Sequence, residues 1–429
     1  MQYYSLKNNN HKISFKEAVI AGIAPDRGLY FPDKITKLPS SFFTNIEQLS
    51  TTEIAYQVID QFIGDCIPKS NLVQILEEVL DFDFPVVRID SNIRTLELFH
   101  GPTMAFKDVG ARFMSKCLEY FNKNTQHKTT VLVATSGDTG GAVANGFLKA
   151  KNIDVVILYP KGKVSEIQEL QLTTLGHNIT ALEVVGTFDD CQDMVKTAFL
   201  DKDIQDKRKL TSANSINIAR WLPQAFYYFL AFKQLKSAGK EIVFSVPSGN
   251  FGNICAGIVA KKLGLPSKHL IAATNSNDVI SRFLKNGIYE PKPSLATLSN
   301  AMDVGDPSNF NRILELYKNN FTDLKTEFSS YSFNDNDTKK AIQELYAKAS
   351  YIADPHGAVG YLGLKKHGLT LNEIGVFLET AHPIKFRSII EETLEVSLEI
   401  PYQIKEILHK KKKSNLIVNY QNLKTLLMS

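Results

Sequence analysis

Short apolar runs, separated by segments of helical character, recur along most of this chain and limit the folds open to it. Between residues 129 and 380 they read TTVLVAT, IDVVILYP, ALEVVG, EIVFSV, LIAAT and IGVFLET. Strands that are apolar along their whole length are typical of parallel sheets covered by helices on both faces. The pattern therefore predicts an α/β fold with two parallel-sheet domains, built around residues 129–205 and 241–380.

The chain has 429 residues, more than one ordinary core supports, so two or three domains are expected. We expect an N-terminal, mostly helical unit at residues 1–82, where TTEIAYQVIDQFI and KSNLVQILEEVL have apolar residues at helical spacing. Two α/β domains follow at 83–240 and 241–400, and residues 401–429 form a C-terminal tail. The HKKKK run in this tail is interpreted as a solvated helix end or loop rather than a nucleic-acid patch.

Charge, cysteine spacing and hydropathy argue against several classes of protein. The 49 Lys and Arg residues against 45 Asp and Glu give a net charge of +4, too weak to indicate nucleic-acid binding. The four cysteines are far apart and no zinc-type spacing occurs, so no metal site is expected. No apolar stretch approaches the ~20 residues that span a bilayer, and no signal-peptide run is present. We expect a cytoplasmic protein that binds neither nucleic acid nor membranes.

A lysine, Lys107, follows a Gly-Pro turn in GPTMAFKDVGARFM, at the expected start of an amphipathic helix. Thr103 is a candidate cap for that helix. Its buried face is predicted from the spacing of Gly110, Phe113, Met114, Cys117, Leu118 and Phe121. A helix N-terminus disfavours a positive charge by roughly 0.3–1 kcal/mol, too little to leave the amine neutral, whereas burial has a larger effect. Alone, the segment fits either a surface charge or a reactive amine.

Two glycine-rich loops each follow a predicted strand and precede a predicted helix. The first is SGDTGG at residues 136–141, and the second is SGNFGN at residues 248–253. Small residues let backbone N–H groups approach an anion, and a helix N-terminus adds favourable potential. Neither loop has a Walker sequence or the dinucleotide-binding fingerprint. One such loop can be a mere tight turn, but two beside a candidate amine indicate two anionic groups to be held.

Two further segments supply side chains suited to an anion site. In SANSINIARW the spacing of Asn214, Ser215, Asn217 and Arg220 allows them to converge at a helix start. Arg220 offers a planar fork for phosphate or carboxylate, although an ordinary surface arginine is the alternative. Thr380 ends the predicted strand in IGVFLETAHP, and ligands of open parallel sheets bind at the carboxyl ends of strands.

Six motifs, in one order, are similar to those of the threonine synthase family: APDRGLYFP, GPTMAFKDVGARF, TSGDTGGAVA, SANSINIAR, PSGNFGN and LETAHPIKF. These enzymes use pyridoxal phosphate and have the tryptophan-synthase-β type of fold. The similarity spans roughly residues 15–390, and the leading unit resembles the bacterial and fungal branch. Arg27 and Gly357 depart from the commonest family pattern, which has glycine and threonine there; neither falls on the chemistry.

The resemblance implies a role for each candidate residue. Lys107 would form the Schiff base with pyridoxal 5'-phosphate, Thr380 would face the pyridine nitrogen, and Asp138 would lie near the phenolic oxygen. The cofactor phosphate would bind backbone N–H groups of Gly249, Asn250, Phe251, Gly252 and Asn253. The substrate carboxylate would contact the loop of Ser136, Gly137, Asp138 and Thr139, and the substrate phosphate would contact Thr139, Ser215 and Arg220.

The implied reaction is γ-elimination of phosphate from O-phospho-L-homoserine and β-addition of water, which gives L-threonine and phosphate. Lys107 would move the protons, because its amine is freed when substrate binds. A related pyridoxal-phosphate phospho-lyase or dehydratase that releases 2-oxobutyrate is the alternative enzyme, and a non-catalytic binding protein on the same scaffold is the alternative class. A monomer or homodimer is expected.

Overall fold

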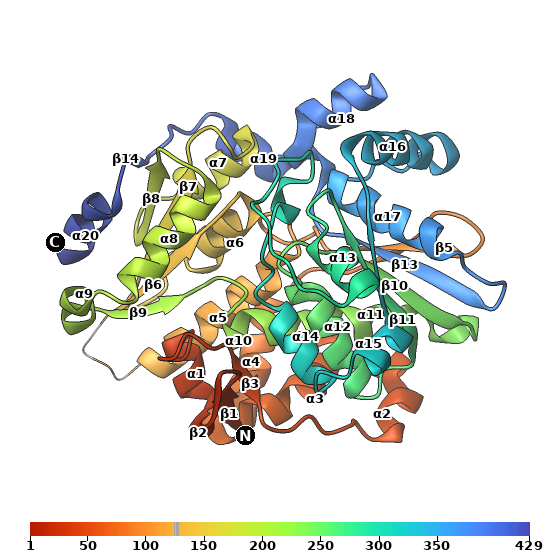
Figure 1. Ribbon diagram of the computed structural model, residues 1–429, viewed down its shortest axis with the longest axis horizontal. Coiled ribbons are helices and arrows are strands. Elements are labelled where there is room, and N and C mark those ends of the chain that lie inside the picture. The colour runs from red at the N-terminus through yellow and green to blue at the C-terminus, as the bar shows by residue number, and fades with distance from the viewer. Residues whose placement is uncertain (124, 126–127) are drawn as a thin grey trace. The chain divides into compact units, whose positions relative to one another are not determined.

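The computed structural model describes residues 1–123, 125 and 128–429, which form two compact units (Figure 1). The first unit consists of Met1, Pro32–Phe106 and Trp221–Glu399. The second consists of Gln2–Phe31, Lys107–Arg220 and Ile400–Ser429. Neither unit is continuous in sequence, because the chain passes from one to the other after Met1, Phe31, Phe106, Arg220 and Glu399.

A six-stranded sheet in the order β12-β11-β10-β13-β5-β4 lies at the centre of the first unit. Its strands are β4 (Val86–Arg88), β5 (Ile93–Glu97), β10 (Glu241–Pro247), β11 (Ser267–Thr274), β12 (Phe328–Ser332) and β13 (Glu373–Glu379). Neighbouring strands are parallel except β4 and β5, which are antiparallel. The carboxyl ends of β10, β11 and β13 therefore lie at the same edge of the sheet. The residues that follow these strands there are the 248–253 loop, Asn275 and Thr380.

Helices cover this sheet and extend the unit around it. They are α2 (Ser40–Asn45), α3 (Thr51–Ile63), α4 (Lys69–Val79), α11 (Phe226–Leu235), α12 (Gly252–Lys262), α13 (Val279–Asn286), α14 (Phe310–Leu316), α15 (Phe321–Glu327), α16 (Asp335–Ala349), α17 (Pro355–His367) and α18 (Arg387–Leu394). Single 3-10 turns are η1 (Ile46–Gln48), η2 (Gly64–Cys66), η3 (Leu222–Ala225), η4 (Lys236–Ala238), η5 (Asn300–Met302) and η6 (Pro383–Phe386). Helix α17 lies directly on β10, β11 and β13. Its glycines allow the approach, since a Cβ at Gly363 would lie 2.4 Å from Ser245 Oγ.

The second unit has a five-stranded parallel sheet in the order β14-β8-β7-β6-β9. Its strands are β6 (Thr129–Ala134), β7 (Ile153–Pro160), β8 (Ile179–Val184), β9 (Lys209–Ser212) and β14 (Asn415–Ile417). Its helices are α1 (Phe15–Ala21), α5 (Lys107–Asn122), α6 (Asp138–Gly146), α7 (Glu166–Thr173), α8 (Phe188–Ala198), α9 (Lys202–Lys207), α19 (Tyr402–Leu408) and α20 (Tyr420–Met428), with α10 (Ile218–Trp221) at the unit boundary. The C-terminal tail thus supplies an edge strand to this sheet.

The N-terminal segment is less helical than the sequence suggests. Three strands, β1 (Gln2–Ser5), β2 (Asn8–Ser14) and β3 (Tyr30–Pro32), form a small sheet in the order β2-β1-β3, with α1 between the second and third. The residues of Asn8–Ser14 are mostly polar, and all of them are at least partly exposed. Such a strand has no buried face and gives little periodic signal.

Helix α5 confirms the predicted amphipathic pattern. The side chains of Phe113, Met114, Cys117 and Leu118 are fully buried, as the spacing predicts. The helix begins at Lys107 itself, so the expectation that Thr103 caps it is wrong. Thr103 lies four residues earlier, in a turn closed by the N–H of Met104 donating to the carbonyl of Gly101 (3.0 Å).

Candidate functional site

The loop after β10 is a tight cradle at the start of α12. The N–H of Ser248 donates to the carbonyl of Ala273 (2.9 Å), which fixes the loop to β11. Phe251 has the left-handed φ of 60° and α12 begins at the next residue. A Cβ at Gly249 would lie 2.6 Å from Met302 Cα, so only glycine fits there.

Residues beyond the cradle hold it from outside. The Oδ1 atom of Asn250 accepts from the N–H of Ser308 (2.7 Å), and the Asn250 carbonyl accepts from Nδ2 of Asn309 (3.0 Å). Within α12, Oδ1 of Asn253 accepts from the Tyr228 hydroxyl (2.8 Å). The first N–H groups of a helix have no partner within the helix and favour an anion. The 249–253 loop therefore has the form of a phosphate cradle.

Thr380 lies at the same sheet edge and is buried. Its carbonyl accepts from the N–H of Phe106 (2.9 Å), and a bridge pairs Ala105 with Ala381. The backbone of Ala105 and Phe106, just before Lys107, is therefore fixed to the end of β13. Lys107 itself is partly buried, at the first residue of α5.

The loop after β6 is organised by Thr135. Its hydroxyl oxygen accepts from the N–H groups of Gly137 (2.9 Å) and Gly140 (2.8 Å). Gly137 has a φ of 140°, in a region that favours glycine, and α6 begins at Asp138. Asp138 is 3% exposed. Ser136, Gly137, Asp138 and Thr139 thus share the carboxyl end of one strand.

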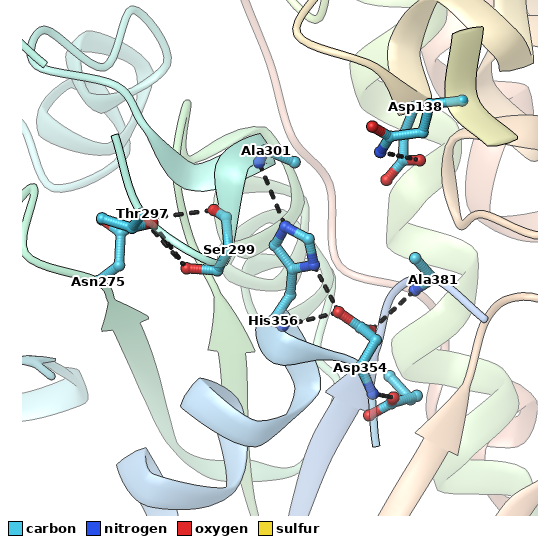
Figure 2. A network of polar contacts seen from close by, with 10 residues as sticks. Asp138, Asn275, Thr297, Ser299, Ala301, Asp354, His356 and Ala381 are labelled. Carbon is cyan, nitrogen blue, oxygen red and sulfur yellow. Dashed lines mark hydrogen bonds and ion pairs between the residues drawn. The ribbon is translucent and has the colours of Figure 1, made fainter. Parts of the chain in front are cut away.

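Gln168 is a partner of this loop that no sequence motif identifies. Its Nε2 donates to Oδ1 of Asp138 (3.0 Å), a bond drawn at Asp138 in Figure 2. Its Oε1 accepts from the N–H of Ser165 (3.1 Å), which orients the amide as a donor toward Asp138. A Cβ at Gly137 would lie 2.4 Å from the same Oε1. The Ser-x-x-Gln spacing predicts a capping box, but nothing local predicts Asp138 as the partner.

Arg220 is buried rather than on the surface, which removes the surface arginine as an alternative. One of its Nη1–H groups donates to the carbonyl of Ala213. Its backbone packs against α5, where a Cβ at Gly110 would lie 2.7 Å from the Arg220 carbonyl oxygen. Arg220 therefore lies one helical turn from the start of α5, where Lys107 is found.

Asn214 and Asn217, which the spacing grouped with Arg220, bind backbone groups of neighbouring elements. Asn214 Nδ2 donates to the carbonyl of Ala134 (2.8 Å) at the end of β6. Asn217 Nδ2 donates to the carbonyl of Val19 (2.9 Å) in α1. These bonds hold Ser215, the residue after Asn214, near the carboxyl end of β6. In the second unit, the structure thus brings Ser215 toward the 136–139 loop.

A polar network surrounds Asn275, Thr297 and Ser299 (Figure 2), and Met302 of the same segment lies against Gly249. Asn275, directly after β11, donates through Nδ2 to the Thr297 hydroxyl (2.8 Å) and to Oδ1 of Asp303 (2.8 Å). The Thr297 hydroxyl donates to the same Asp303 oxygen (2.7 Å). Burial raises the pKa of Asp303 to about 6, although the hydrogen bonds from Thr297 and Asn275 oppose that shift. The network fixes residues 297–303, which carry Met302 against Gly249.

Comparison with known proteins identifies the family. A family model described as pyridoxal-phosphate dependent enzyme matches residues 95–376, and one described as threonine synthase N terminus matches residues 2–80. The threonine synthase of Buchnera aphidicola subsp. Baizongia pistaciae is 46% identical, over 94% of each chain. This chain belongs to the threonine synthase family. The resemblance of the six motifs is confirmed, and the family is pyridoxal-phosphate dependent.

Solved threonine synthase structures have the same fold. The Escherichia coli enzyme superposes with a TM-score of 0.94 at 42% identity, covering 100% of this chain and 99% of that one. A structure of pyridoxal-phosphate-bound threonine synthase from Brucella melitensis gives a TM-score of 0.93 at 33% identity, with the same coverage. The α/β fold with parallel sheets is therefore the fold of this family.

The residues of this chain fit the cofactor of the threonine synthase family. Gly249 leaves a backbone cradle that a Cβ would fill, at the N-terminus of a helix, as a phosphate requires. Thr380 offers a hydroxyl at the strand end, and Lys107 offers a primary amine. Within the described residues, no group of His, Cys, Asp and Glu could hold a metal ion. In the same part of the chain, no helix has the length and apolar character to cross a membrane.

Both departures from the family pattern have a physical account. Arg27, at a position that is commonly glycine, has a left-handed φ of 64°, a conformation that glycine adopts most readily. Its N–H donates to the carbonyl of Ala24 (2.8 Å), which closes the turn. Gly357 faces Glu379, whose Oε2 would lie 1.6 Å from a Cβ at position 357. A threonine there would collide with this carboxyl group.

Proposed function

We propose that this enzyme converts O-phospho-L-homoserine and water into L-threonine and phosphate, with pyridoxal 5'-phosphate bound through Lys107. The observation that carries the proposal is the 249–253 cradle, which shares a sheet edge with Thr380. The Thr380 carbonyl in turn binds the residue before Lys107. When bound, the cofactor supplies a conjugated ring that withdraws electrons from the substrate.

Lys107 is the residue that attaches the cofactor and then moves protons at the substrate carbons. A lysine in this role must gain and lose its proton near neutral pH. Its position at the first residue of α5 disfavours the charged form by roughly 0.3–1 kcal/mol, and its partial burial adds to this effect. The residue before it, Phe106, is bonded through its N–H to the Thr380 carbonyl (2.9 Å).

The remaining residues hold the cofactor and the substrate. Backbone N–H groups of Gly249, Asn250, Phe251, Gly252 and Asn253 would bind the cofactor phosphate, and the hydroxyl of Thr380 would face its ring nitrogen. A hydroxyl, unlike a carboxylate, does not stabilise a positive charge on that nitrogen strongly. Asp138 would contact the phenolic oxygen, and the loop of Ser136, Gly137, Asp138 and Thr139 would bind the substrate carboxylate.

The leaving phosphate of the substrate binds Thr139, Ser215 and Arg220. A dianionic group requires charge-assisted hydrogen bonds, and a guanidinium supplies two parallel donors. The burial of Arg220 strengthens such a contact, because little water competes with it. A cytoplasmic location belongs to the same proposal, since the four cysteines are free thiols, as is usual in a reducing compartment. A monomeric or homodimeric state is also part of it.

Product analysis tests the proposed reaction. Purified enzyme incubated with O-phospho-L-homoserine is expected to release L-threonine and phosphate in equal amounts. Release of 2-oxobutyrate and ammonia in place of threonine would show a phospho-lyase or dehydratase and would overturn the proposal.

The role of Lys107 has its own test. Lys107→Ala should lack both the visible absorption of bound cofactor and turnover, because no other amine takes its place. The control is Lys116→Ala on the same helix, whose amine lies 3.8 Å from Glu119 at the surface and which should retain both. Retention of either property by Lys107→Ala would refute the assignment.

A further inference from the structure

A chain of buried hydrogen bonds runs through His356 (Figure 2). The Nε2 atom of the ring accepts from the N–H of Ala301 (3.3 Å), so in the neutral ring the proton lies on Nδ1. Nδ1–H then donates to Oδ1 of Asp354 (2.5 Å). His356 is 2% exposed, so water does not compete with either bond. The ring thus connects a backbone group to a buried carboxylate.

Asp354 continues the chain of bonds to the end of β13. Its Oδ2 accepts from the N–H of Ala381 (3.2 Å), the residue after Thr380. Its Oδ1 also accepts from the N–H of His356 (2.7 Å) and so caps the start of α17. Both carboxylate oxygens of Asp354 therefore accept hydrogen bonds from backbone N–H groups. One of these groups is at the start of α17, and the other is at the end of β13.

The other end of the chain of bonds reaches the phosphate cradle. Ala301 precedes Met302, and Met302 Cα is the atom that a Cβ at Gly249 would approach to 2.6 Å. Ala301 also lies within η5, which packs over the cradle. His356 and Asp354 thus join the segment that covers Gly249 to the segment that carries Thr380.

The carboxyl group of Glu379 lies beside Asp354 and Gly357. It is fully buried, and its Oε1 accepts from the N–H of Asp354. Its Oε2 has no hydrogen-bond partner among the described residues and occupies space left by Gly357. Burial, and then the neighbouring Asp354 carboxylate, raise the pKa of Glu379 well above its ordinary value. Burial and the neighbouring carboxyl group therefore favour the protonated form of Glu379, while the oxygens of Asp354 accept the hydrogen bonds from His356 and Ala381.

We propose that Asp354 and His356 are positioning residues that set the spacing between Thr380 and the 249–253 cradle, and thereby the affinity for pyridoxal 5'-phosphate. The inference rests on the proposed function, since it takes those two segments as the cofactor contacts. The ring nitrogens of an ordinary buried histidine can form hydrogen bonds with any neighbouring polar group. Here one ring nitrogen of His356 bonds Ala301, next to the residue that packs on Gly249, and the other bonds Asp354. Asp354 in turn bonds Ala381, the residue next to Thr380.

The test measures cofactor retention rather than turnover. Holoenzyme is dialysed, the remaining cofactor is measured by its visible absorption, and pyridoxal 5'-phosphate is titrated back to obtain a dissociation constant. His356→Ala is expected to raise that constant about tenfold or more, the effect of losing a hydrogen bond to a charged group. His356→Gln, whose amide oxygen can reach the N–H of Ala301, should recover most of the affinity.

A second histidine of the same unit provides the matched control. His269 lies on β11, bonds Ser329 through Nε2 (2.8 Å), and stands near the amino end of that strand, away from Asn275. His269→Ala should lower the melting temperature but leave the dissociation constant within about twofold. An equal rise in both variants, or no rise in His356→Ala, would overturn the proposal.

Two further comparisons keep the outcome decisive. If His356→Ala does not fold, His356→Asn replaces it, because asparagine can keep the Asp354 contact but cannot reach Ala301. Weaker cofactor binding by His356→Asn than by His356→Gln is then expected, and equal binding refutes the role. Visible absorption retained by Lys107→Ala would instead mean that the proposed function, and not the positioning role, has failed.

Discussion

At the level of single residues, the buried polar side chains of the candidate site have identifiable partners. Arg220 is 3% exposed and still carries a charged group, which costs free energy unless partners compensate. The carbonyl of Ala213 is one such partner, and Gly110 leaves room for the arginine backbone against α5. A guanidinium in such surroundings is suited to binding a phosphate through charge-assisted hydrogen bonds. This is the physical reason to expect Arg220 in substrate binding as well as in stability.

Replacing Arg220 with lysine tests this reading. Lys keeps the charge but loses the planar pair of donors, so Arg220→Lys should raise KM for O-phospho-L-homoserine about tenfold or more. Cofactor content, measured by visible absorption, should stay near that of the unchanged enzyme. Equal losses of cofactor and of substrate affinity would show that the arginine is structural.

The hydrogen bond from Gln168 to Asp138 gives a second prediction at this scale. Gln168→Glu replaces a donor with a carboxylate that faces Asp138, so we expect kcat/KM to fall about tenfold or more. Glu166→Gln, an exposed change in the same turn of α7, should have little effect and serves as the control. A variant Gln168→Glu with unchanged kinetics would contradict a positioning role for Gln168.

At the level of helices and strands, α17 packs closely on the sheet because several of its residues are glycines without a side chain. Its glycines lie against the sheet, and the carbonyl of Gly360 accepts from the Ser245 hydroxyl (2.6 Å). Gly357 makes room for the Glu379 carboxyl group, which a Cβ would meet at 1.6 Å. The helix and strand β13 are therefore matched at this pair, as complementary volumes in a close-packed interior must be.

The pair can be tested as a double-mutant cycle. Gly357→Ala should destabilise the protein by about 1–3 kcal/mol through overpacking. In the background of Glu379→Ala, which removes the carboxyl group, the same substitution should cost much less. Denaturant unfolding of the four proteins measures the coupling, and additive effects would refute the contact.

At the scale of the whole molecule, each unit has its own sheet and its own buried core. Residues such as Val243, Ile271 and Phe377 form the core beneath α17, and Leu158, Leu182 and Leu423 belong to the core of the other sheet. Leu423 comes from α20, so the tail contributes to that core as well as to the sheet edge. Buried histidines make the stability of the first unit sensitive to pH.

Acid should weaken the first unit through His269. Burial, and then the stacked His367 ring at 4.9 Å, lower the pKa of His269 to about 4. Lys261 lowers it further, while Glu373 and a backbone bond at Thr326 oppose this. Since an unfolded histidine has a pKa of about 6.5, the folded state favours the neutral ring. This stabilisation is complete above pH 6.5 and is lost as the pH falls toward 4.

A comparison with His269→Gln isolates this effect, because glutamine can bond Ser329 but does not titrate. The stability advantage of the unchanged protein, measured by denaturant unfolding, should decrease between pH 6.5 and pH 4. His382, whose pKa burial also lowers to about 4, titrates equally in both proteins and cancels in the comparison. An advantage that is constant over this range would contradict the prediction.

The amino-acid sequence predicts those elements in which burial follows a local pattern. Continuous apolar runs identified parallel strands such as β6 and β10, and the helical spacing of Phe113 and Leu118 identified the buried face of α5. Each glycine-rich loop was found because it follows a strand and starts a helix. The ordered motifs indicated the family, and the polar run at Asn8–Ser14 gave no periodic signal for its strand.

Only the tertiary structure decided which distant residues meet. It paired β5 with β13 although residues 83–240 and 241–400 were expected to form separate domains, and it brought Gln168 to Asp138. It also placed His356 between Ala301 and Asp354, two partners that no local pattern predicts. The reason is physical: periodicity reports whether a side chain faces water, whereas a partner depends on how separate segments pack. That packing is set by complementary volumes and by the need to pair every buried polar group.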